Sequence, residues 1–238
     1  MPKRKTIRRL YPPYKGNDEL TRMRLLEAAG PIFAAVGFHR AKIRDICARA
    51  GANVAAVNYH FGDKLGLYTE VLRYSIAAAQ INPDLHANKS NIPPEARLRS
   101  FVRMILDCVF NSSRPAWHMK LVLQEMSDPT PAMDEVVKEF IRPRYEILCS
   151  LIGSLIGESS TSRITQLCAH SIVGQARHYV IANAVIGAVW PELSFTRKNI
   201  DEIADHITAF SLAGIKAAGA AKSTRNTTAN RRAAKGRP

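Results

Sequence analysis

The chain has 238 residues and a formal net charge of +14, from 34 lysines and arginines against 20 aspartates and glutamates. A hydrophobic share of 46% is enough for one large core or two smaller ones. No apolar run reaches the roughly 18 residues that a membrane span needs, and the basic N-terminus lacks the apolar segment of a secretory signal. The four cysteines have no metal-ligand spacing and are expected to be free thiols in a reducing cytoplasm. We therefore expect a cytoplasmic protein with no membrane partner, no metal and no cofactor.

The first segment, residues 1–17, contains six basic residues and no acidic ones. It has no apolar periodicity, so it is predicted to be a disordered basic arm. Such an arm either is a solvated chain end with no binding role or adds salt-dependent contacts to phosphates. We favour phosphate contacts, because the arm leads into the segment described next.

The segment from Ile43 to Lys64 predicts two short helices separated by a tight turn, with a third helix starting at once. Ile43, Ile46, Cys47 and Ala50 form one apolar stripe at helical spacing. Gly51 follows where a helix end favours positive φ, and Asn53 is a strong N-cap for a helix from Val54 to His60. This is the layout of a helix-turn-helix DNA reader.

These residues resemble the DNA-binding domain of TetR-family transcriptional regulators. The similarity lies in Phe33 and Gly37, in the stretch 46–51, in the Asn-Tyr-His-Phe ending at 58–61 and in Lys64. The ending and the Leu67-Tyr68 pair that follows it are similar to the CecR-like subgroup. The chain departs from the family at Ala41 and Lys42, where threonines are usual, and at Val54 and Asn58.

The resemblance implies a set of DNA-binding residues within residues 18–64. Small or amide side chains at the start of a recognition helix let its backbone approach base edges closely. Residues expected to face bases are Asn53, Ala55, Ala56 and Asn58. Residues expected to hold phosphates are Lys42, Arg44, Tyr59, His60 and Lys64.

The remainder of the chain is predicted to be helical, which makes the fold all-α. A connecting helix covers residues 65–80, and an effector-binding and dimerisation domain covers residues 81–218. Prolines 83, 93 and 94 indicate a loop. Helices are expected at 95–111, 115–126, 131–156 with a kink at Pro143, 161–189 and 199–215. The tail, residues 219–238, has six basic and no acidic residues and is predicted to be disordered.

The last two long helices carry more apolar surface than one buried face needs. Burial inside one subunit is one explanation, and a four-helix interface in a homodimer is the other. The resemblance favours the homodimer, whose paired recognition helices would read a palindrome.

The resemblance also implies a pocket for an unidentified small-molecule effector. Plain core packing competes with ligand contact for every candidate residue. The candidates are Phe101, Ile105, Trp117, Leu121, Met126, Phe140, Tyr145, Arg177 and His178.

The predicted function is sequence-specific transcriptional regulation, as a ligand-responsive repressor that binds double-stranded DNA. We expect no enzyme and no catalytic residue, since no nucleophile elbow, Gly-rich phosphate loop or His-Glu-x-x-His motif occurs. The competing hypothesis is an architectural protein that binds DNA without sequence preference through its basic tails.

Overall fold

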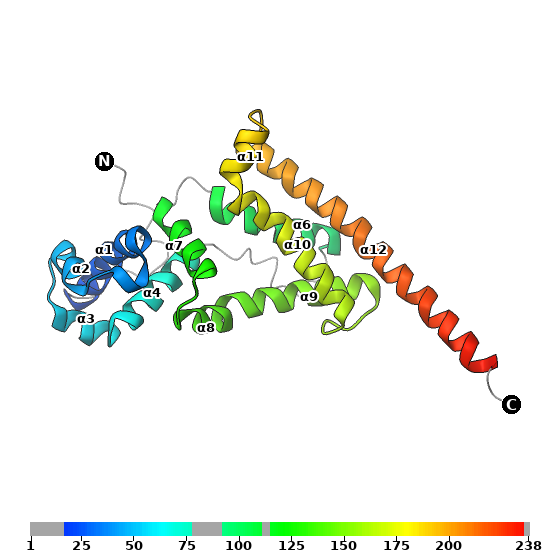
Figure 1. The fold of residues 1–238 in the computed structure, drawn as a ribbon, viewed down its shortest axis with the longest axis horizontal. Coiled ribbons are helices and arrows are strands. Elements are labelled where there is room, and N and C mark those ends of the chain that lie inside the picture. Colours follow the sequence, from blue (N-terminus) through cyan, green and yellow to red (C-terminus); the bar gives the residue numbers. More distant parts are fainter. Residues whose placement is uncertain (1–16, 78–91, 111–114, 236–238) are drawn as a thin grey trace. The chain divides into compact units, whose positions relative to one another are not determined.

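The computed structural model describes residues 17–77, 92–110 and 115–235, and within these ranges every regular element is a helix (Figure 1). The predicted all-α class is therefore confirmed. The chain divides into two compact units, residues 1–80 with 111–142 and residues 81–110 with 143–238. The predicted N-terminal arm lies outside the described residues except for Asn17.

The first unit begins with α1 (Asn17–Arg40), α2 (Ile43–Ala50), α3 (Val54–Phe61) and α4 (Lys64–Ala77). The core among them is built on Leu25, Phe33 and Leu72, all fully buried. Gly37 has φ 78° and ψ 168°, outside helical values, and interrupts α1 one turn from its end. Only glycine adopts such a conformation without strain, and it sets the direction of the last turn of α1.

The first unit also contains α7 (Ala116–Ser127), α8 (Ala132–Val136) and a π-helical turn (Val137–Ile141), which were predicted to belong to the second domain. By packing they belong with the first unit, because α7 contacts α1 and α4, and α8 contacts α4. The Trp117 indole makes one of these contacts: a Cβ built on Gly30 would lie 2.2 Å from it. A glycine inside α1 thus makes room for a large aromatic ring that belongs to α7.

The predicted kink at Pro143 takes the form of the π-helical turn, which ends two residues before that proline. Proline has no amide hydrogen to donate and its ring crowds the carbonyl four residues back. A wider turn at this point relieves the crowding without ending the helix, which continues as α9 (Arg142–Ile156).

The second unit contains α6 (Pro94–Phe110), most of α9, α10 (Arg163–Ile181), α11 (Asn183–Val189) and α12 (Arg197–Lys235). Its core is built on Leu98, Leu148, Ile172 and Ile207. The helix predicted at 161–189 is divided at Ala182. The last helix was predicted to end near residue 215, whereas α12 continues to Lys235. The continuation is rich in alanine and contains no proline, which favours helix.

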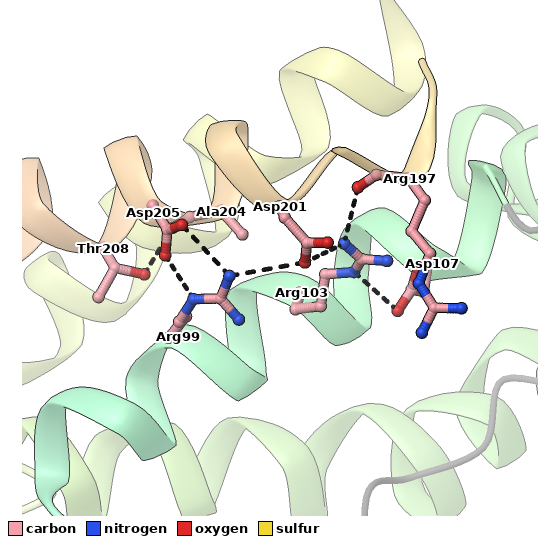
Figure 2. A network of polar contacts seen from close by, with 8 residues as sticks. All are labelled: Arg99, Arg103, Asp107, Arg197, Asp201, Ala204, Asp205 and Thr208. Atoms are coloured by element: carbon pink, nitrogen blue, oxygen red, sulfur yellow. Dashed lines mark hydrogen bonds and ion pairs between the residues drawn. The ribbon is translucent and has the colours of Figure 1, made fainter. Parts of the chain in front are cut away.

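Charged side chains connect α6 to α12 within the second unit (Figure 2). Arg103 lies 2.5 Å from Asp201, and Arg99 pairs with both Asp201 and Asp205. The hydrogen bond from Arg99 lowers the pKa of Asp205 below its ordinary value. Two of the acidic side chains of α12 are therefore committed to arginines of α6.

Candidate nucleic-acid interface

The helix α2 is held in place by its apolar stripe. Ile46, Cys47 and Ala50 are buried, and Gly51 ends the helix with φ 60° and ψ 42°. Lys42 occupies the N-cap position with extended backbone, and its side chain makes no capping hydrogen bond. Lys42 and Arg44 are both exposed. Two exposed cations thus flank a helix N-terminus, where partial positive charge also favours an anion.

The helix α3 presents a continuous exposed face. The Asn53 side chain accepts a hydrogen bond from the Ala56 amide at 2.9 Å, which confirms it as the N-cap. Val57 is only 1% exposed and anchors the opposite side of the helix. The exposed face consists of Val54, Ala55, Asn58 and Tyr59, with Tyr59 75% exposed. This face has the size and the chemistry to enter a DNA major groove.

The structure removes one residue from the expected base-facing set and adds another. Ala56 is half-buried and packs against the core, so it contributes little to the exposed face. Val54, which was not among the residues expected to face bases, is 44% exposed. Its position four residues before Asn58, on the same side of a helix, is the signal that could have identified it.

Two of the expected phosphate ligands are engaged inside the unit. The His60 side chain is 7% exposed, and its Nε2 lies 3.5 Å from the Asp18 carboxylate of α1. The ring is largely covered within the unit, which favours this contact over phosphate binding for His60. The Lys64 ammonium donates to the His39 carbonyl at 3.1 Å and lies 4.8 Å from the centroid of the Phe38 ring. Lys64 therefore ties the start of α4 to the end of α1.

The candidate effector residues are distributed over both units. Trp117, Leu121, Met126 and Phe140 lie in the first unit, and Leu121 is fully buried in its core. Phe101, Ile105, Tyr145, Arg177 and His178 lie in the second unit, where Phe101 is 4% exposed and His178 is exposed. Burial raises the pKa of Tyr145, which also shares a hydrogen bond with Cys149.

The described residues contain no candidate metal site and no candidate membrane span. No group of three or more histidine, cysteine, aspartate or glutamate side chains there is arranged to hold a metal ion. None of the described helices is long and apolar enough to cross a membrane.

Two family models match the chain. The model described as bacterial regulatory proteins, tetR family, matches residues 25–71, which contain α2 and α3. The model described as HTH-type transcriptional dual regulator CecR, C-terminal domain, matches residues 94–215, just over half of the chain.

Curated relatives agree with these matches. The HTH-type transcriptional dual regulator CecR of Shigella flexneri is 26% identical over 168 residues, covering 66% of this chain and 74% of that protein. The HTH-type transcriptional regulator BetI of Pectobacterium atrosepticum is 33% identical over 92 residues, covering 38% of this chain and 47% of that protein. The second match thus spans about half of the relative.

Solved structures share the fold at low identity. A TetR-family transcriptional regulator from Streptomyces coelicolor has a TM-score of 0.58 and 20% identity, covering 83% of this chain and 97% of that one. A mutant of HlyIIR has a TM-score of 0.57 and 21% identity, covering 79% of this chain and 100% of that one.

Proposed function

The chain belongs to the TetR family of transcriptional regulators, with a C-terminal domain of the CecR type, and we propose that it is a homodimeric, ligand-responsive repressor that binds a palindromic operator. The observation that carries the proposal is the exposed face of α3, presented by a capped helix that Val57 anchors to the core.

Base contacts are proposed for the exposed face of α3. The Asn58 amide carries a donor and an acceptor on neighbouring atoms of one plane, which suits an adenine edge. Val54 and Ala55 offer apolar contact of the kind that selects a thymine methyl group. Asn53 already uses its side-chain oxygen as the cap, so only its amide nitrogen is available for a base.

Phosphate contacts are proposed for Lys42, Arg44 and Tyr59, which surround this face. Lys64 keeps two further N–H donors beyond the one given to His39, so it remains a secondary candidate. The helix α3 contains no lysine or arginine. Recognition would therefore depend on shape and hydrogen bonding more than on charge.

The homodimer is supported by an exposed apolar face in the second unit. Leu167, Ile181 and Val185 are 53%, 59% and 64% exposed, and Phe210 on α12 is 64% exposed. In a two-fold dimer the same face would be covered on both subunits. Two α3 helices about 34 Å apart would then read the two halves of a palindrome.

Effector response is proposed on the family resemblance, with Phe101, Ile105 and Tyr145 as the candidates nearest the core of the second unit. Binding there would change DNA affinity by favouring one of two arrangements of the dimer.

Selection of binding sites from random duplexes tests the proposal. We expect an enriched inverted repeat from the purified protein. A pool without sequence preference would contradict it and favour the architectural DNA-binding protein instead.

A further inference from the structure

The helix α12 extends past the end of the matched C-terminal domain. It runs without interruption from Arg197 to Lys235, whereas the family match ends at residue 215 (Figure 1). The first half of α12 packs into the second unit, where Ile200, Ile207 and Ile215 are buried. A Cβ built on Gly219 would lie 3.3 Å from the Ile156 side chain, so α12 still lies close to α9 at this point. The twenty residues after 215 add about 30 Å of helix.

The charge of α12 changes at the same place. Residues 197–215 contain two basic and three acidic residues, and residues 216–235 contain six basic and no acidic residues. Asp201 and Asp205 are paired with arginines of α6 (Figure 2). Two of the three acidic side chains in the first half of α12 therefore do little to neutralise the basic second half.

The composition of residues 216–235 leaves them without an apolar face. Ile215 is the last large apolar residue of the chain, and the apolar residues that follow are all alanines. A helix that is polar on all sides gains no stability from core packing, and like charges along it repel. A partner that supplies closely spaced negative charge would remove this repulsion.

We propose that residues 216–235 of α12 form a second DNA-binding element, a basic helical arm that holds duplex phosphates without sequence preference. Insertion into a membrane surface needs an apolar face, which this segment lacks. A protein partner is generally anchored by aromatic or large apolar side chains, and none occurs here. Duplex DNA requires only cations spaced along a rod, since it carries one charge per about 1.7 Å of its axis.

The arm differs from the base-reading face of α3 in what it adds to binding. Each phosphate neutralised adds about 0.9 to the slope of log affinity against log salt concentration. Six basic residues therefore add up to about 5 to the slope for each subunit, equally on operator and non-operator DNA. The proposal goes beyond reading of the operator and stands independently of it.

The test uses the full chain with Lys222, Arg225, Arg231, Arg232 and Lys235 all changed to glutamine. The matched control exchanges lysine and arginine at the same five positions, so the charge is kept. Binding to a non-operator duplex is measured by fluorescence anisotropy between about 50 and 200 mM salt. The neutral variant is expected to lose at least about tenfold in affinity at the lowest salt and about 2 to 4 in slope, with the control unchanged.

An unchanged slope in the neutral variant would overturn the proposal. So would tighter binding of the parent protein to phosphatidylserine vesicles, or to single-stranded RNA, than to the duplex. Selection of binding sites with the parent protein and with the neutral variant distinguishes failure of this proposal from failure of the proposed function. If parent and neutral variant select the same inverted repeat, the arm takes no part in base recognition. If the salt slope changes but neither protein selects a site, the arm binds DNA and the proposal of a sequence-specific regulator is wrong.

Discussion

The Tyr68 hydroxyl of α4 donates a hydrogen bond of 2.8 Å to the Glu125 carboxylate of α7. Glu125 is 1% exposed, and its other oxygen accepts from the amide and the hydroxyl of Thr130 at 2.9 and 3.0 Å. A buried carboxylate is tolerated because three donors surround it. The pair joins the helix that follows the DNA reader to a helix from a later part of the chain.

Removal of this donor is expected to destabilise the first unit. Tyr68→Phe leaves one oxygen of a buried carboxylate without its partner, which costs about 1 to 3 kcal/mol in the free energy of unfolding. Urea denaturation followed by circular dichroism measures the change. Tyr59→Phe, at an exposed position, is the matched control. A Tyr68→Phe protein as stable as its parent would show that the bond contributes nothing net.

The same hydroxyl predicts a dependence of stability on alkaline pH. Burial first, and then the hydrogen bond to Glu125 and its charge, raise the pKa of Tyr68 far above its ordinary value. Below about pH 10 this hydroxyl is protonated in both the folded and the unfolded chain, so its contribution is complete. Above that pH the unfolded chain loses the proton while the folded unit keeps it, and the free energy of unfolding falls by up to about 1.4 kcal/mol per pH unit.

Urea midpoints between about pH 8 and pH 11 test this dependence. Tyr68→Phe should show a shallower alkaline fall than the parent protein, because the other tyrosines titrate in both. Parallel curves would mean that Tyr68 ionises as easily in the folded chain as in the unfolded one.

Gly30→Ala should clash with Trp117. A methyl group there would lie 2.2 Å from the indole, so the ring or the helix must move, at a cost of about 1 to 3 kcal/mol. In the double variant Gly30→Ala, Trp117→Leu, the loss should be smaller than the sum of the two single losses. Thermal melts of the four proteins measure the coupling, and strict additivity would contradict the contact.

Phe210→Glu should dissociate the proposed dimer and leave each subunit folded. The side chain is 64% exposed in the isolated chain, so a charge there is tolerated until a second copy covers it. Sedimentation velocity should show monomers, and circular dichroism should still show a helical spectrum. Leu20→Glu, at an exposed position on α1, should remain dimeric. A dimer that survives Phe210→Glu would place the interface elsewhere.

Asn58→Ala and Tyr59→Ala should affect DNA binding in different ways. Loss of the Asn58 amide should relax preference at one base pair by about 1 to 3 kcal/mol. Loss of the Tyr59 hydroxyl should weaken binding to all sequences about equally, as expected of a phosphate contact. Anisotropy with operator and single-substitution duplexes distinguishes them. A change in sequence preference with Tyr59→Ala would assign that residue to a base.

Local signals in the sequence were sufficient to place the DNA reader. The stripe around Ile46, the cap at Asn53 and the glycine at 51 each act within a few residues, and the structure confirms all three. The burial of His60 was not predicted, because its partner, Asp18, is far away in the sequence. The packing of Trp117 over Gly30 is a long-range contact of the same kind, which periodicity along one helix does not reveal.

Charge was a poor guide to regular structure at the end of the chain. A run with six basic and no acidic residues indicated disorder, whereas its many alanines and its continuity with a buried helix favour α12 as far as Lys235. The effector site was beyond prediction for another reason. Apolar residues that line a pocket and apolar residues that fill a core have the same spacing along a helix.

The packing of α7 and α8 on α1 and α4 determines how this protein can be recombined with its relatives. A chimera that exchanged only residues 17–77 would bring a foreign α1 and α4 against the native Trp117, Leu121 and Glu125. The foreign α1 would need a glycine next to the Trp117 indole, and the foreign α4 would need a hydroxyl facing the Glu125 carboxylate. Grafts of DNA specificity onto this chain should therefore replace the exposed residues of α2 and α3 alone, or carry residues 116–141 with the reader as one piece.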